Sequence, residues 1–135
     1  AWLNGSLTSA TVIVAAPRSV PRKDADRLRA LGARVLLLPA RKGRIAADAF
    51  LAALGNVGIA SLLVEGGGKT AGWLVGAGAV DRYLFFLAPL LLGEGIRAVA
   101  GFAPRRVTDG RRLVITKIAR ADGDIILVAE ALPDG

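Results

Sequence analysis

The chain has 135 residues, of which 53% are hydrophobic, and a net charge of +7 at neutral pH. This length is sufficient for one domain with a buried core, and the hydrophobic content excludes a disordered chain. Cysteine and histidine are both absent, which excludes disulfides, thiolate nucleophiles, histidine acid–base catalysis and the usual cysteine/histidine zinc site. We therefore expect no bound metal.

The basic residues occur in short clusters that are not interleaved with aromatic residues, so a nucleic-acid interface is a weaker expectation than a solvated surface or a phosphorylated small-molecule ligand. No segment has the pattern of a signal peptide or a membrane span. We expect a cytoplasmic protein without a membrane partner. Because the chain begins with Ala1 rather than Met, we also expect a fragment, a processed product or a domain of a longer protein.

The first half of the chain predicts alternating strands and helices. Short apolar runs ending at Pro17 and Pro39 predict strands at residues 11–16 and 34–38. Apolar residues at helical spacing predict helices at 24–31 and 46–54, each closed by a glycine. A third strand is predicted at Ser61–Val64, directly before a run of glycines.

The second half continues with a helix predicted from Lys69 to Ala77. The apolar run Arg82–Ala88 predicts a strand covered on both faces. Residues 113–120 and 125–130 flank an Asp-Gly pair, which predicts an antiparallel hairpin. This order predicts a mixed α/β sheet within a single domain, residues 1–135.

The stretch Leu63–Thr70, written LVEGGGKT, ends like a nucleotide-triphosphate loop. Its spacing argues against that motif, because the first glycine would have to stand at Leu63. Gly66, Gly68 and Ala71 fit the dinucleotide fingerprint, but the acidic residue expected about 20 residues later is missing. A tight strand-to-helix turn without any ligand is the structural alternative.

Glycines between a strand and a helix allow an anion to approach the backbone, where the first N–H groups and the helix dipole attract it. A diphosphate is the natural ligand for the amides of Gly67 through Gly72. Glu65 is expected at the end of a buried strand, where it either caps backbone N–H groups or accepts hydrogen bonds from substrate hydroxyls. Arg18 is the best-placed side chain for a second phosphate, with a solvated arginine as the alternative.

Three segments together resemble a known family: residues 62–68 (LLVEGGG), residues 73–74 with 79–82 (WL and AVDR), and residues 87–93 (LAPLLLG). Their order and spacing are similar to the reductase domain of the bifunctional riboflavin-biosynthesis deaminase/reductase. A weaker match extends from about Thr11 to Leu132. The resemblance implies a dihydrofolate-reductase-like fold, a mixed sheet flanked by helices and closed by an antiparallel hairpin.

The resemblance also implies an activity, the NADPH-dependent reduction of 5-amino-6-(5-phosphoribosylamino)uracil to the ribitylamino form. Hydride would pass to C1 of the ring-opened sugar, so the chemistry rests on the cofactor and needs neither His nor Cys. The family implies cofactor binding by Gly67, Gly68, Lys69, Thr70, Ala71, Gly72 and Trp73, and substrate binding by Glu65. It identifies no catalytic residue here.

The chain departs from the family in lacking the N-terminal strands that carry further substrate contacts. A zinc deaminase domain would have to lie upstream in a longer parent chain. Two alternatives therefore stay open: a dihydrofolate-reductase-like reductase of another substrate, and a non-catalytic nucleotide-binding or regulatory domain. The apolar composition also favours a homodimer.

Overall fold

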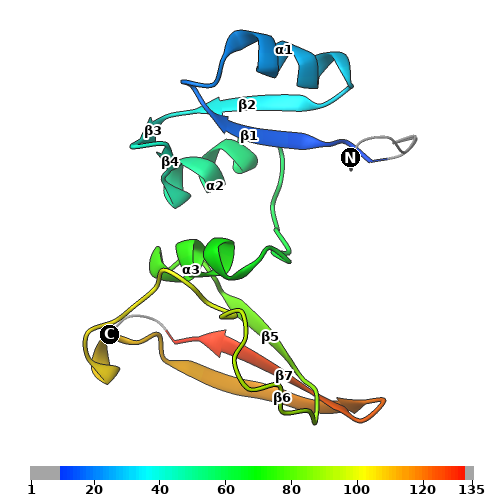
Figure 1. The fold of residues 1–135 in the computed structure, drawn as a ribbon, viewed down its shortest axis with the longest axis vertical. Coiled ribbons are helices and arrows are strands. Elements are labelled where there is room, and N and C mark those ends of the chain that lie inside the picture. Colours follow the sequence, from blue (N-terminus) through cyan, green and yellow to red (C-terminus); the bar gives the residue numbers. More distant parts are fainter. Residues whose placement is uncertain (1–9, 133–135) are drawn as a thin grey trace. The chain divides into compact units, whose positions relative to one another are not determined.

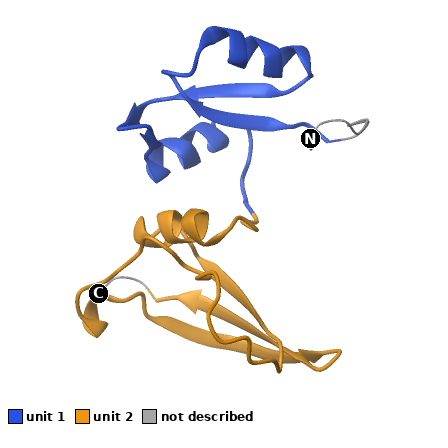
Figure 2. Cartoon of the chain, viewed as in Figure 1, with its two compact units in different colours: residues 1–62 blue, residues 63–135 orange. Residues whose placement is uncertain are grey.

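The computed structural model describes residues 10–132 and divides into two compact units, which we call the N-terminal unit (residues 1–62) and the C-terminal unit (residues 63–135) (Figure 2). Helices and strands occur in both, so the predicted α/β class is confirmed. The described strands form a parallel pair, a short antiparallel hairpin and an antiparallel three-stranded sheet, so both strand directions of the expected mixed sheet occur.

The N-terminal unit is built on two parallel strands, β1 (Ile13–Pro17) and β2 (Arg34–Leu38), connected by helix α1 (Arg22–Ala30). Figure 1 shows α1 on one side of the strands and helix α2 (Ala47–Gly55) on the other. Small and branched apolar side chains make up the buried core of this unit: Ala25, Ala33, Leu38, Ala47 and Leu54. The strand and helix assignments from the sequence are correct here to within about two residues.

A short hairpin after β2 was not predicted. Strands β3 (Ala40–Arg41) and β4 (Arg44–Ile45) pair in antiparallel fashion across Lys42 and Gly43. Both turn residues have positive φ, 51° and 74°, as a two-residue hairpin turn with the right twist requires. Its strands are too short for the hydrophobic pattern to reveal them.

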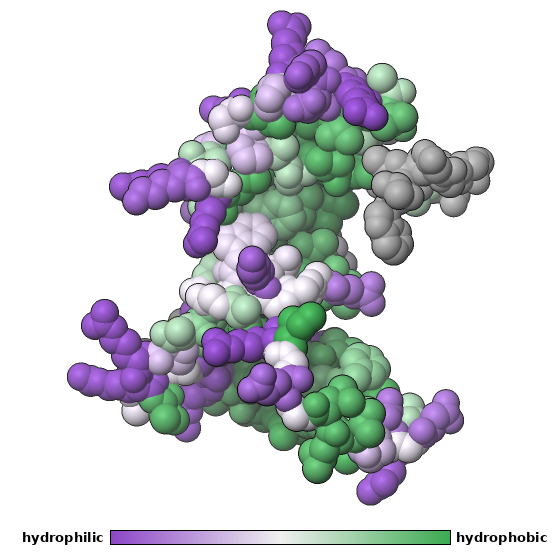
Figure 3. Space-filling view, in the orientation of Figure 1, coloured by the Kyte–Doolittle hydropathy of each residue, from purple (hydrophilic) through white to green (hydrophobic). Residues whose placement is uncertain are grey.

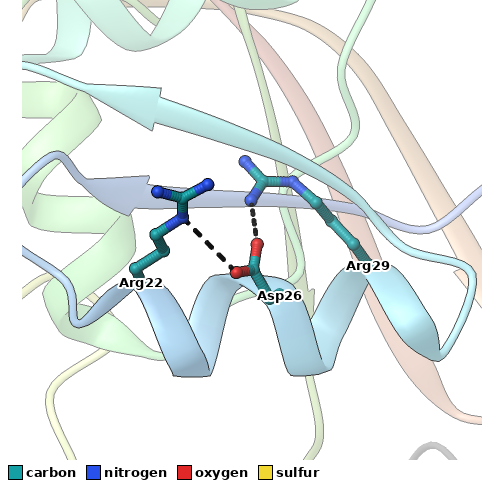
Figure 4. Close-up of polar contacts among 3 residues, drawn as sticks. All are labelled: Arg22, Asp26 and Arg29. Carbon is teal, nitrogen blue, oxygen red and sulfur yellow. Dashed lines mark hydrogen bonds and ion pairs between the residues drawn. The ribbon is translucent and has the colours of Figure 1, made fainter.

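The exposed side of α1 carries a small ion network (Figure 4). The Asp26 carboxylate accepts a 2.8 Å hydrogen bond from Arg29 Nη1 and lies 3.7 Å from Arg22 Nε. These side chains are at least 45% exposed, so each pair contributes no more than about 0.5 kcal/mol. Ala25 is the residue of α1 that is buried in the unit's core.

The C-terminal unit packs helix α3 (Gly68–Gly76) on an antiparallel sheet. The sheet has the order β5–β7–β6, with β5 at Arg82–Leu87, β6 at Leu113–Ala121 and β7 at Asp124–Ala131. A short 3₁₀ turn, Val107–Asp109, precedes β6. Leu74, Val75 and Ala129 are the buried core of this unit.

The predicted hairpin between β6 and β7 is confirmed. Its turn places Asp122 at φ 48° and Gly123 at φ 95°, as the Asp-Gly pair indicated. A bulge between Ile115 and Lys117 shifts the register of β6 against β7, and the Thr116 hydroxyl donates to the Val128 carbonyl oxygen at 3.3 Å.

Two strand predictions differ from the structure: one strand is absent, and the other is present but is not covered on both faces. Residues 61–64 are not a strand, because no described strand pairs with them, and Leu63 is 74% exposed. Strand β5 exists, but β7 is its single partner among the described strands, and Phe86 is 67% exposed rather than covered. Figure 3 shows such apolar side chains at the surface of the C-terminal unit. A branched apolar run predicts a strand, but not the neighbour that must complete its hydrogen-bond ladder.

Candidate phosphate-binding site at the start of helix α3

The glycine run leads directly into α3. Gly67 precedes the helix in an extended conformation (φ −63°, ψ 172°), and its carbonyl oxygen accepts hydrogen bonds from the N–H groups of Thr70 and Ala71 at 2.9 and 3.2 Å. No described side chain caps this end of the helix. The first N–H groups of α3 are therefore directed toward a ligand or solvent.

Residues 96–100, which we call the strap, pack against the start of α3 through their backbone. The Ala100 N–H donates to the Gly68 carbonyl oxygen at 2.8 Å. A Cβ added to Gly68 would overlap the carbonyl oxygen of Arg97, and one added to Gly72 would overlap that of Ala100. These two glycines, one helical turn apart, are therefore needed for close backbone packing.

The other two glycines of the run have different surroundings. A Cβ on Gly66 would come within 2.9 Å of the Thr70 Cβ, so the Thr70 side chain fills the space beside it. A Cβ on Gly67 would meet nothing within 4 Å. Gly67 is therefore the glycine that leaves open space at the start of the helix.

A cavity of about 380 Å³ lies between the start of α3 and the strap. Its lining is mostly apolar, and the lining residues include two basic ones and no acidic one: Gly67, Gly68, Lys69, Thr70, Ile96, Arg97 and Ala100. The two basic residues and the positive end of the helix dipole both attract an anion. The start of α3 is therefore a candidate site for an anion.

Only part of the predicted cofactor set lines this cavity: Gly67, Gly68, Lys69 and Thr70 do, and Ala71, Gly72 and Trp73 do not. Gly72 is buried against the strap, and Ala71 and Trp73 are half-buried along α3. Glu65 lies two residues before Gly67 and is exposed. The expectation that Glu65 ends a buried strand is wrong, because residues 61–64 are unpaired. Arg18 belongs to the N-terminal unit, where it follows β1.

Sequence reasoning missed Arg97. It lies far from the glycine motif along the chain, so no local pattern connects the two. The available signal was the four-residue spacing of Gly68 and Gly72, which predicts a smooth helix surface for another backbone to approach.

A second cavity, of about 670 Å³, lies beyond the other end of α3. Arg111 Nε donates to the Val75 carbonyl oxygen at 3.4 Å, near the negative end of the helix. Tyr83 lines the cavity, and partial burial raises the pKa of its phenol; Arg111 lowers this pKa and Asp81 raises it. Arg82 Nη2 is paired with Glu130 Oε1 at 3.0 Å on the same wall.

The described residues form neither a metal cluster nor a membrane-spanning helix. Residues 10–132 contain no group of three or more acidic, His or Cys side chains placed to hold a metal ion. Within the same residues, every helix is too short or too polar to cross a bilayer.

The glycine-led start of α3 and the strap packed on it lie within the part of the chain that matches a known family. The RibD C-terminal domain profile matches residues 4–127. The chain belongs to the RibD C-terminal domain family. The riboflavin biosynthesis protein RibD of Bacillus amyloliquefaciens is 35% identical over 120 residues, 87% of this chain and 31% of that protein. This chain thus spans about a third of the length of that curated relative.

Solved structures show the same fold as this RibD C-terminal domain. Acinetobacter baumannii RibD (form 2) superposes with a TM-score of 0.72 at 23% identity, covering 90% of this chain and 31% of that one. A pyrimidine reductase-like protein from Corynebacterium diphtheriae gives a TM-score of 0.63 at 22% identity, covering 93% and 51%. The resemblance and the dihydrofolate-reductase-like fold expected from the sequence are confirmed.

Proposed function

We propose that this chain is the reductase part of a riboflavin-biosynthesis enzyme and takes part in the NADPH-dependent reduction of 5-amino-6-(5-phosphoribosylamino)uracil to the ribitylamino form. The observation that carries the proposal is the family match across residues 4–127, which includes the glycine-led start of α3. The name of the Corynebacterium relative, a pyrimidine reductase-like protein, also supports it.

The residues at the start of α3 fit the phosphate part of a dinucleotide. Gly67 leaves open space, Lys69 and Arg97 supply positive charge, and no acid lines the cavity. When bound, NADPH supplies the hydride for the reduction. The chain's own contribution is to hold the phosphates with the N–H groups and cations at this cavity, and to orient the substrate.

Glu65 is our candidate for the substrate side. It lies before the glycines and is exposed, so its carboxylate is accessible to hydroxyl groups of a phosphoribosyl or ribityl chain. A carboxylate beside the phosphates themselves would repel them. This assignment keeps the negative charge of Glu65 apart from the basic cavity, which it does not line.

We further propose that both units belong to one reductase domain, because the family match spans them. In the parent protein, a zinc deaminase domain would precede it, and the enzyme would act in the cytoplasm. Exposed apolar side chains on β5, including Leu84 and Phe86, support a homodimer, which sedimentation of the chain would test.

The first experiment is a titration of this chain with NADPH, NADH and ATP, followed by tryptophan fluorescence. The chain has two tryptophans, and Trp73 lies on α3 one turn beyond the cavity residues. We expect saturable binding of NADPH, much weaker binding of ATP, and loss of the fluorescence response in Trp73→Phe. Preference for ATP would reject the reductase assignment. Binding of NADPH without turnover by the longer parent would favour a regulatory domain.

Gly67→Asp tests the site within this titration. The new carboxylate would enter the open space at the start of α3, so we expect NADPH affinity to fall at least about tenfold, the effect of about 1.4 kcal/mol. Gly67→Ala is the matched control, because its Cβ meets nothing within 4 Å and adds no charge. Unchanged affinity in a folded Gly67→Asp variant would move the cofactor site away from this loop.

A further inference from the structure

We propose that Asp122, in the turn between β6 and β7, is a site of spontaneous modification, where the chain forms an isoaspartyl bond to Gly123 (Figure 1). The inference is independent of the proposed function and concerns the chemical ageing of the three-stranded sheet. It distinguishes this Asp-Gly pair from the other one in the described part of the chain, Asp109-Gly110.

The reaction joins the main-chain nitrogen of Gly123 to the side-chain carbon of Asp122. The nitrogen attacks Cγ, its proton and the carboxyl hydroxyl leave together as water, and a cyclic imide forms. Water then opens the imide at one of its two carbonyl carbons. Opening at the main-chain carbonyl leaves the chain connected through Cγ, which is the isoaspartyl bond, and opening at Cγ restores aspartate. Glycine favours the attack because it has no Cβ to hinder it, and water is the only co-reactant.

The reacting groups of Asp122 and Gly123 are not held by other contacts. Both residues are exposed, and a Cβ added to Gly123 would meet nothing within 4 Å, so the turn is uncrowded. Among the described residues, the Asp122 carboxylate forms no ion pair and the Gly123 N–H donates to no backbone carbonyl oxygen. The nitrogen can therefore approach Cγ without first breaking a hydrogen bond.

The pair Asp109-Gly110 has the same two residues, but hydrogen bonds hold it. One carboxylate oxygen of Asp109 accepts from the Arg106 N–H at 3.2 Å, and the other accepts from the Thr108 hydroxyl at 3.4 Å. The Gly110 N–H, whose nitrogen would have to attack, donates to the Val107 carbonyl oxygen at 3.1 Å. These contacts must break before the reacting atoms can meet, so the fold should slow the reaction at this pair.

The modification should weaken the sheet, because the turn sets the pairing of its strands. The two-residue turn places Ala121 opposite Asp124, and both turn residues have positive φ, as this type of turn requires. An isoaspartyl bond adds a methylene group to the main chain within the turn, so the turn no longer fits this register. Strand β7 is paired with both β5 and β6, so the disturbance acts on the central strand of the sheet.

The experiment is ageing of the 135-residue chain in mildly acidic buffer, once folded and once unfolded in urea. Peptide mapping with an endoproteinase that cleaves before aspartate but not before isoaspartate measures the conversion at each Asp-Gly pair. In the folded chain we expect conversion at Asp122 to be at least about tenfold faster than at Asp109, a difference of about 1.4 kcal/mol in the barrier. In urea this difference should disappear, because the hydrogen bonds that protect Asp109 are broken. Equal rates in the folded chain, or faster conversion at Asp109, would overturn the inference.

Asp122→Glu is the matched control for the effect on the sheet, because glutamate keeps the charge but would have to close a larger ring. Urea unfolding compares fresh and aged samples of both chains. The pairs Asn4-Gly5 and Asp134-Gly135 are the same in both chains, so their conversion cancels. Aged wild type should lose stability in proportion to conversion at Asp122, and aged Asp122→Glu should not. Conversion at Asp122 without this loss would overturn the effect on the sheet, and the comparison with Asp109 needs no variant to fold.

Discussion

At the residue scale, Tyr83 provides a direct test of local burial. It is the only tyrosine of the chain, and partial burial raises its pKa above the ordinary value of 10.0. We expect ultraviolet titration of the phenolate to give a midpoint above 10.0 in the folded chain. A midpoint at or below 10.0 would show that Arg111 dominates over burial.

The same shift predicts a pH dependence of stability. Because the folded-state pKa is raised, the stabilising contribution of the neutral phenol is fully present below pH 10.0 and is lost as the pH rises through the folded-state value. Tyr83→Phe should therefore make the alkaline loss of stability shallower, as measured by thermal unfolding at a series of alkaline pH values.

At the element scale, the contact between α3 and the strap predicts an ordered series of glycine variants. Gly68→Ala and Gly72→Ala place a Cβ against backbone carbonyls that cannot rotate away, so each should destabilise the fold by about 1–3 kcal/mol. Gly76→Ala, on the same helix, meets only the Phe102 ring at an ordinary 3.7 Å and should change stability by no more than about 1 kcal/mol, on the stabilising side. Urea unfolding measures all three; equal effects would mean that the strap does not pack here.

Local elements were predictable from the sequence because their signals are local. The Asp122-Gly123 turn and the strand at 34–38 could be assigned from their own residues. The strand expected at 61–64 is absent, and the strand at 82–88 is present but not covered on both faces, because pairing partners and burial depend on residues elsewhere in the chain. The position of Arg97 at the cavity could not be predicted for the same reason, because it depends on a backbone contact with Gly68, which is distant along the chain.

At the scale of the whole molecule, residues 61–64 stand out as an exposed apolar segment. They carry exposed Leu62, Leu63 and Val64, without a described strand partner. The amides of this segment should exchange rapidly with deuterated water, because no described strand pairs with them, whereas the paired amides of β1 and β2 should be protected. Slow exchange at 61–64, comparable to that of β1 and β2, would contradict this.

The strap is attached to α3 by main-chain atoms: a carbonyl oxygen beside Gly68, another beside Gly72, and the N–H of Ala100. Every amino acid except proline offers these groups. Folding therefore places little demand on the side chain at position 97, although that residue lines the cavity. Ligand preference and stability can then vary separately at this position, which makes residue 97 a natural place to evolve or engineer the domain toward a different anion.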